Sequence, residues 1–335
     1  MSRICLVSAV TLSAVVLTAC GSSSEPEPAA PSSTPSTTAQ PTTTAAQSQA
    51  TVYTLPGSGV FPEGITADDN TFYVTSTADG AVFRGTVGTP DVAPFLAGGQ
   101  DGRTGAAGLD VEDNRLVIAG GATGTVWIYD TQSGQLTGRF SNGLGADATF
   151  LNDVVISDDG DAYITDSRSP NLYRIPESRV DGNNPAQAPL ESFVDFTGSP
   201  FVYGEGFNAN GIVEADDDAL VVVQSSTGNL YRVDEESRAV TAVDLGGANV
   251  QNGDGMETDD DTLYVVRNRD GLITTIDLSD DGTSGRVTGE ITDPSFAYPT
   301  TVASVDDRLL VVNSQFDKRG GTPVEPFTVS GVRKN

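Results

Sequence analysis

Four of the six residues at one recurring position could hold a metal ion. A short phrase occurs six times in the chain, and its first residue changes from copy to copy while the alternating pattern after it persists. The six opening residues are Glu63, Ala107, Asn152, Asn210, Asp254 and Thr300. Four of them offer carboxylate or amide oxygens, the ligands that hard cations such as calcium take together with water. If the repeats place them on one ring, these side chains can converge on one divalent ion.

The elements that must position these residues are β-strands. In each copy an alternating strand leads into an acidic or Asn-containing turn, then into a β-branched or aromatic strand, and a further strand follows. The copies start 44, 45, 58, 44 and 46 residues apart. Three strands and a weaker fourth per repeat are typical of a propeller blade, whose first strand lines the central channel. We therefore predict an all-β fold, a six-bladed β-propeller over residues 51–335.

The ends of this repeat array predict how the ring closes. The last copy runs out of chain, whereas residues 51–56 form an isolated strand before the first copy. Because an open sheet edge is a liability, we expect this N-terminal strand to complete the last blade. The long third interval predicts an insertion over residues 176–206, a loop that could cover part of one channel mouth. Tyr203 in this insertion could contact a ligand or could only pack on the blade edge.

Net charge and the lack of histidine limit the partners and the reaction types that the chain can have. The formal net charge is -28, with 46 acidic and 18 basic residues, which argues against nucleic acid as a partner. The 335 residues include no histidine, so imidazole cannot serve as base, proton shuttle or metal ligand. Carboxylates, amides, hydroxyls or a metal must then carry any reaction.

Simpler explanations compete at several places. The donors of the ring could be solvated polar residues around a channel mouth. The acidic turns at 158–161, 216–218 and 259–261 lack EF-hand spacing, and turn chemistry accounts for them. Trp127, the only tryptophan, is expected to pack in the core.

The N-terminus is typical of an exported protein. Residues 1–20 combine Arg3, a short apolar run and the ending Leu17-Thr18-Ala19-Cys20, which resembles the bacterial lipobox. A plain secretory signal or a retained membrane helix are the alternatives. We expect a lipid on Cys20 to anchor the chain to the bacterial cell membrane, with the domain outside the cytoplasm. Residues 21–50, rich in Ser, Thr and Pro, are expected to be a disordered tether.

Four dipeptides carry a resemblance to a known family. They are Glu63-Gly64, Asn152-Asp153, Asn210-Gly211 and Asp254-Gly255, in the first, third, fourth and fifth repeats. Over residues 51–335 the chain resembles the senescence marker protein, gluconolactonase and regucalcin family, six-bladed propellers that include calcium-dependent lactone hydrolases. The resemblance implies that Glu63, Asn210 and Asp254 bind one divalent cation, calcium before Zn²⁺, Mn²⁺ or Mg²⁺. It further implies that Asn152 contacts the substrate or completes the metal's ligand set, and that Asp254 is the general base for a water.

The sequence also departs from this family. Phe150 stands where sugar-lactone members carry an arginine, so a less polar ring than a sugar lactone is expected. Phe150, Tyr203 and Thr300 are the candidates for a substrate pocket. The expected function is metal-dependent hydrolysis of a small-molecule lactone or related ester, in which the ion polarises the carbonyl and histidine is not needed. The alternative is a non-catalytic surface propeller that binds a small ligand or a protein partner.

Overall fold

The computed structural model describes residues 50–216 and 219–334. The described residues form one compact unit. The predicted signal segment, Cys20 and nearly all of the predicted tether lie outside the described residues, as does part of the acidic turn at 216–218. Within the described residues, none of the helices has the length and apolar character needed to cross a membrane.

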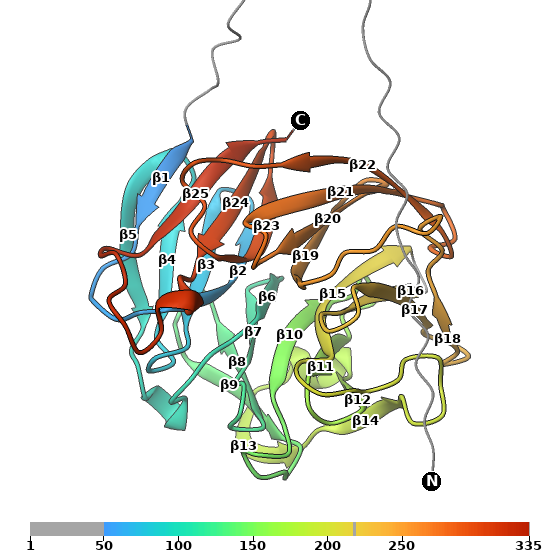
Figure 1. Cartoon of the computed structure of the whole chain (residues 1–335). Coiled ribbons are helices and arrows are strands. Elements are labelled where there is room, and N and C mark those ends of the chain that lie inside the picture. Colours follow the sequence, from blue (N-terminus) through green and yellow to red (C-terminus); the bar gives the residue numbers. More distant parts are fainter. Residues whose placement is uncertain (1–49, 217–218, 335) are drawn as a thin grey trace, which may run out of the picture. The chain divides into compact units, whose positions relative to one another are not determined.

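Nearly all of the regular secondary structure in the described residues is β-strand, arranged in sheets around a common centre (Figure 1). The inner strands are β2 (Pro62–Asp68), β6 (Leu109–Glu112), β10 (Leu151–Ile156), β15 (Ala209–Asp216), β19 (Gly253–Asp259) and β23 (Pro299–Val305). Each inner strand contacts the next one along the chain, and β23 contacts β2. The inner strands therefore form a closed ring.

Three further strands follow each inner strand outward. The second strands are β3 (Thr71–Ser76), β7 (Arg115–Ala119), β11 (Ala162–Asp166), β16 (Ala219–Gln224), β20 (Thr262–Arg267) and β24 (Arg308–Asn313). The third strands are β4 (Val82–Thr86), β8 (Thr125–Asp130), β12 (Asn171–Ile175), β17 (Asn229–Asp234), β21 (Leu272–Leu278) and β25 (Thr328–Arg333). The outer strands are β5 (Thr89–Leu96), β9 (Leu136–Ser141), β14 (Glu191–Asp195), β18 (Val240–Ala242), β22 (Gly285–Ile291) and β1 (Thr51–Thr54).

Hydrogen bonding groups these strands into five sheets, one of eight strands, one of five and three of four. The eight-stranded sheet contains both ends of the domain, because β1 pairs antiparallel with β25 and, through Thr54 and Asp91, parallel with β5. Pairing of the N-terminal strand with the last strand is what the predicted closure requires. The predicted all-β class is confirmed, whereas the number of blades stays a prediction.

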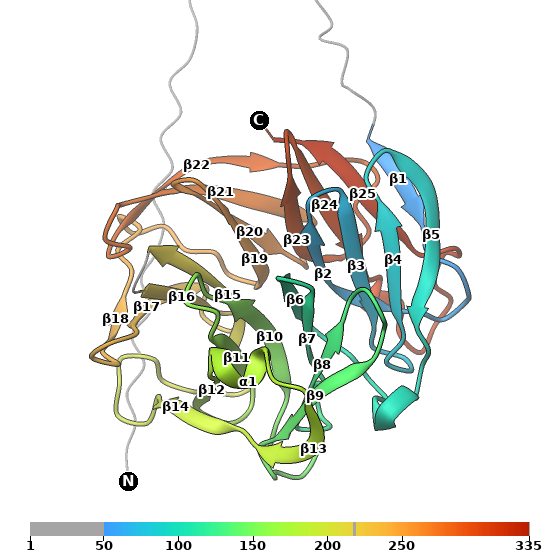
Figure 2. The same ribbon diagram turned by 180° about the vertical axis from the view of Figure 1, so that it is seen from behind.

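The insertion is more ordered than expected. It contains α1 (Glu177–Val180), β13 (Asn184–Pro189) and β14, while short 3-10 turns η1 (Gln100–Gly102) and η2 (Phe316–Lys318) lie elsewhere. Strand β13 pairs parallel with β9 of the preceding sheet, and β14 pairs antiparallel with β12 (Figure 2). The prediction of a loop over all of 176–206 is therefore wrong for its first half, whose backbone groups pair at the outer edges of two sheets.

Local chemistry explains the tight turns and the glycines of the repeat. Asp69 and Asp260 adopt left-handed conformations with φ of 51° and 49° in the turns after β2 and β19, a conformation that Asp tolerates. A Cβ on Gly64 would lie 2.6 Å from the carbonyl oxygen of Ala107, and one on Gly211 would lie 2.3 Å from that of Asp254. The glycine after the variable residue thus lets adjacent inner strands approach closely.

Candidate functional site

One cavity collects the predicted donors. Glu63, Asn152, Asn210 and Asp254 all line a cavity of about 970 Å³, which we call the donor cavity. They belong to β2, β10, β15 and β19, strands far apart in sequence but close in the inner ring. The structure therefore brings together the four oxygen donors that the repeat pattern singled out.

A repeated break in strand register aims these side chains. Pairing between inner and second strands shifts between Pro62 and Ile65, Leu151 and Val154, Ala209 and Ile212, Gly253 and Met256, and Pro299 and Val302. Each break spans the variable residue of the repeat and the residue after it. Such irregularities re-aim side chains and are frequent beside functional sites. The variable position is thus held by a local backbone feature that five repeats share.

Asp254 is held by two amides. Its Oδ1 accepts a hydrogen bond from Asn210 Nδ2 and its Oδ2 accepts one from Asn268 Nδ2, each at 2.7 Å. Burial raises the pKa of Asp254 to about 6, against the opposing effect of the two amide donors. Asn210 Nδ2 also donates to Ser225 Oγ at 2.8 Å. Since its amino group serves protein acceptors, the amide oxygen is the atom of Asn210 that suits a cation.

Glu63 carries the clearest sign of a missing partner. Its side chain is 6% exposed, and its Oε2 is buried with no hydrogen-bond partner. Burial raises the pKa of Glu63 well above its usual value, the carboxylates of Asp254 and Asp153 add to the effect, and Arg319 opposes it. A buried unpaired oxygen is costly, and so is a second carboxylate beside it. A cation would relieve both.

These residues fit a hard divalent cation of mixed ligation. In the described part of the chain, no group of three or more Asp, Glu and Cys side chains is placed to hold a metal ion. Two carboxylates, Glu63 and Asp254, would therefore need the amide oxygens of Asn152 and Asn210, with water, to complete a ligand set. Asn152 donates its Nδ2 to Ser167 Oγ at 2.8 Å, so its amide oxygen is available in the same way.

Of the three residues predicted for a substrate pocket, one lines the donor cavity and two do not. Phe150 lines the donor cavity and packs edge-on against Phe207, with ring centres 5.0 Å apart. Thr300 and Tyr203 are not among the lining residues. Thr300 is fully buried and donates to the backbone oxygen of Glu63 at 2.7 Å, while Tyr203 donates to the backbone oxygen of Asp166 at 2.7 Å. Thr300 therefore holds the backbone of Glu63, whereas Tyr203 holds the backbone at the end of β11.

Sequence reasoning missed a second set of repeat positions. Four inner-strand residues are hydrogen bonded to a residue that follows them by 14 or 15 positions, directly after the second strand. The pairs are Asn152–Ser167, Asn210–Ser225, Asp254–Asn268 and Thr300–Ser314. A small polar residue at this spacing was a signal in the sequence. It marks the side chain that is hydrogen bonded to the inner-strand residue in these four repeats.

Arg319 was also missed. It follows η2, lines the donor cavity, and stacks its guanidinium over the rings of Phe316 and Phe61, 4.4 and 5.0 Å from their centres. One of its N–H groups donates to Thr77 Oγ1. No repeat places a residue here, so only the fold could bring this cation beside Glu63.

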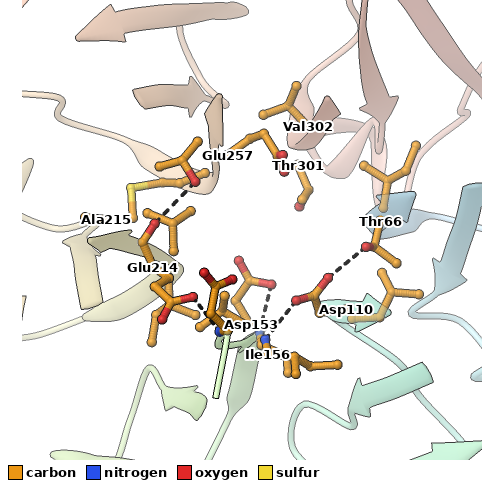
Figure 3. A pocket seen from close by; sticks show the side chains of 18 of the residues that line it. Thr66, Asp110, Asp153, Ile156, Glu214, Ala215, Glu257, Thr301 and Val302 are labelled. Carbon is orange, nitrogen blue, oxygen red and sulfur yellow. Dashed lines mark hydrogen bonds between the residues drawn. The ribbon is translucent and has the colours of Figure 1, made fainter. Parts of the chain in front are cut away.

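A second cavity, of about 660 Å³, is lined by the same inner strands beyond the donor positions (Figure 3). Its acidic lining residues include Asp110, Asp153, Glu214 and Glu257. Asp110 accepts hydrogen bonds from Thr66 Oγ1 at 2.9 Å and from the Ile156 N–H at 2.8 Å. Burial raises the pKa of Asp110, raises that of Glu257 well above its usual value, and raises that of Glu214 to about 7.

This acidic cavity predicts a pH dependence of stability. Because the folded pKa of Glu214 lies above its unfolded value, its contribution is present below about pH 4.5 and is lost as pH rises towards 7. In chelator, we expect a melting temperature higher by a few degrees at about pH 5 than at about pH 8. Glu214→Gln should reduce this difference, and the exposed control Glu236→Gln should not. Thermal melts over a pH series make the measurement. If both variants change the difference in melting temperature equally, Glu214 is not the source of the pH dependence.

Comparison with known proteins supports the fold. No protein-family model matches the chain, and no curated protein matches it by sequence. Among solved structures it is similar to a luciferin-regenerating enzyme (TM-score 0.59, 14% identity, 84% of this chain and 95% of that one). It is also similar to virginiamycin B lyase from Staphylococcus aureus (TM-score 0.56, 16% identity, 79% and 82% covered). A third similar structure is regucalcin from Agrobacterium tumefaciens, described as a calcium-binding protein (TM-score 0.54, 16% identity, 82% and 92% covered). At these identities the similarity shows a propeller fold.

Proposed function

We propose that the chain is a six-bladed propeller enzyme that hydrolyses a small lactone or related ester at the donor cavity with the help of one divalent cation, Ca²⁺. The observation that carries this proposal is the buried Oε2 of Glu63, which has no hydrogen-bond partner and lies in a cavity shared with Asp254 and two asparagines. The calcium-binding description of the similar regucalcin supports the choice of ion.

Each residue has a defined role in this proposal. Glu63, Asn210 and Asp254 would hold the ion, and Asn152 would complete the ligand set or contact the substrate. A divalent ion bound here would polarise the carbonyl oxygen and stabilise the negative charge that develops on it. A carboxylate oxygen of Asp254, oriented by Asn210 and Asn268, would accept the proton of the attacking water. As the acyl C–O bond breaks, the proton held on Asp254 would pass to the departing oxygen. An ester would thus give a carboxylic acid and an alcohol, and a lactone would give a single hydroxy acid.

Hydrolysis is preferred over the lyase activity of some similar structures. One of these structures is a catalytically inactive histidine-to-alanine variant of virginiamycin B lyase. The present chain contains no histidine, so it cannot use that residue type. We further propose that the enzyme is exported and held at the bacterial cell membrane by a lipid on Cys20, and that it acts on small molecules and not on nucleic acid.

The test is turnover of a lactone and aryl-ester panel by the purified full-length chain. We expect hydrolysis with Ca²⁺, loss of it in chelator, and a fall of kcat/KM by about a hundredfold or more in Asp254→Ala. Asp68→Ala is the matched control, because it removes the same charge from the exposed end of β2. Absence of turnover in a folded, Ca²⁺-loaded protein would reject the enzyme and favour the ligand-binding propeller.

A further inference from the structure

The donor cavity has features that metal binding and water activation do not use. One is an apolar wall formed by Phe150 and Phe207, whose rings meet edge to face. Phe207 directly follows the insertion at 176–206 and keeps 43% of its surface exposed. Large exposed aromatic rings at a cavity are places where ligands bury apolar surface.

The second feature is the held guanidinium of Arg319. Its stacking on Phe61 and Phe316 and its hydrogen bond to Thr77 limit its movement. Although it is close enough to Glu63 to influence that carboxyl, Arg319 takes part in none of the ion pairs within 4.0 Å among the described residues. A guanidinium has five N–H donors in a planar fork, so donors remain for a ligand.

The balance of charge in the donor cavity also favours an anionic ligand. Its charged lining residues are Glu63, Glu205, Asp254, Arg269 and Arg319. A bound divalent cation would balance the two buried carboxylates, which leaves two guanidinium groups against Glu205 alone. The loaded cavity would then be positive, although the chain as a whole carries a net charge of -28. A positive cavity in an acidic protein selects anions.

We infer that the substrate is an amphipathic carboxylate, a lactone or ester that carries an apolar or aromatic group for the Phe150–Phe207 wall and a carboxylate for Arg319. This inference rests on the proposed function and specifies its substrate class. It explains why Phe150 occupies the position at which sugar-lactone hydrolases of the resembled family carry an arginine. It also gives Arg319 a role in substrate specificity.

Binding of non-hydrolysable probes to the purified full-length chain tests the inference. In calorimetry with Ca²⁺ present, we expect 4-phenylbutyrate to bind at least about tenfold more tightly than its neutral amide and than gluconate. Arg319→Gln should remove most of the preference for the carboxylate over the amide. Phe207→Ala should lower the affinity for the two phenyl probes and leave the affinity for gluconate unchanged. Arg286→Gln is the control, because it removes the same charge from an exposed ion pair with Asp277.

The outcomes separate this inference from the proposed function. Equal binding of carboxylate and amide, or equal effects of Arg319→Gln and Arg286→Gln, would overturn the substrate class even if esters are hydrolysed. Tight binding of 4-phenylbutyrate that depends on Arg319 would support it even if no ester is turned over. The same titrations in chelator keep the Arg319 comparison informative for a protein that binds no Ca²⁺.

Discussion

Asp254→Ala is expected to lower the affinity of the protein for Ca²⁺ by at least about tenfold, or about 1.4 kcal/mol. Asp254 supplies one of the two carboxylates in the donor cavity beside Glu63, and removing it takes away half of the formal negative charge facing the ion. It also removes the acceptor that orients the Asn210 amide. Both effects weaken a site for a hard cation, which depends on the number and charge of its oxygen ligands.

Calorimetric titration of Ca²⁺ into the full-length variant gives the measurement. Asp68→Ala serves again as control, since it also lowers the acidic count by one but lies at the exposed end of β2. A long-range effect of net charge would change both variants alike, whereas loss of a ligand changes only Asp254→Ala. If Asp254→Ala binds Ca²⁺ as tightly as the unchanged chain, the donor cavity is not the cation site.

The repeat pattern predicted those parts of the molecule that the repeats themselves encode. Alternation and turn residues gave the β class, and Glu63, Asn152, Asn210 and Asp254 were expected on one ring because they share a repeat position. The structure places these four in one cavity. Such a position is predictable because strand pairing and the shared break in register fix its place in five of the repeats.

Other features could not be predicted from a repeat, because they depend on contacts that only one copy makes. Arg319 belongs to a segment after β24 that has no counterpart elsewhere, and its place over Phe61 joins residues from opposite ends of the domain. The first half of the insertion became strand because unpaired edges of β9 and β12 were available to it. Likewise, Thr300 shares the repeat position of the four donors, but its short side chain donates to the backbone oxygen of Glu63.

Closure of the ring by β1 is expected to contribute strongly to the free energy of unfolding. In β1, Tyr53 is 1% exposed, whereas its neighbour Val52 is 42% exposed, because successive side chains of a strand face opposite sides. The Tyr53 ring meets Phe72 edge-on at 5.1 Å, and its hydroxyl accepts a hydrogen bond from the Gly88 N–H at 3.0 Å. Tyr53 packs in the hydrophobic cluster that includes residues from β3 and β24, so it links the two ends of the domain.

Tyr53→Ala is therefore expected to cost about 3 kcal/mol of unfolding free energy or more, which corresponds to a fall in melting temperature of roughly 6–12 °C. Val52→Ala, on the same strand, should cost less than about 1 kcal/mol.

Deletion of residues 51–56 should lower stability at least as much as Tyr53→Ala, since it also exposes the edge of β25. Thermal and denaturant melts of the three variants make the comparison. Should the deletion melt like the unchanged chain, the pairing of β1 with β25 would contribute nothing to stability, and closure would have to depend on the ring of inner strands alone.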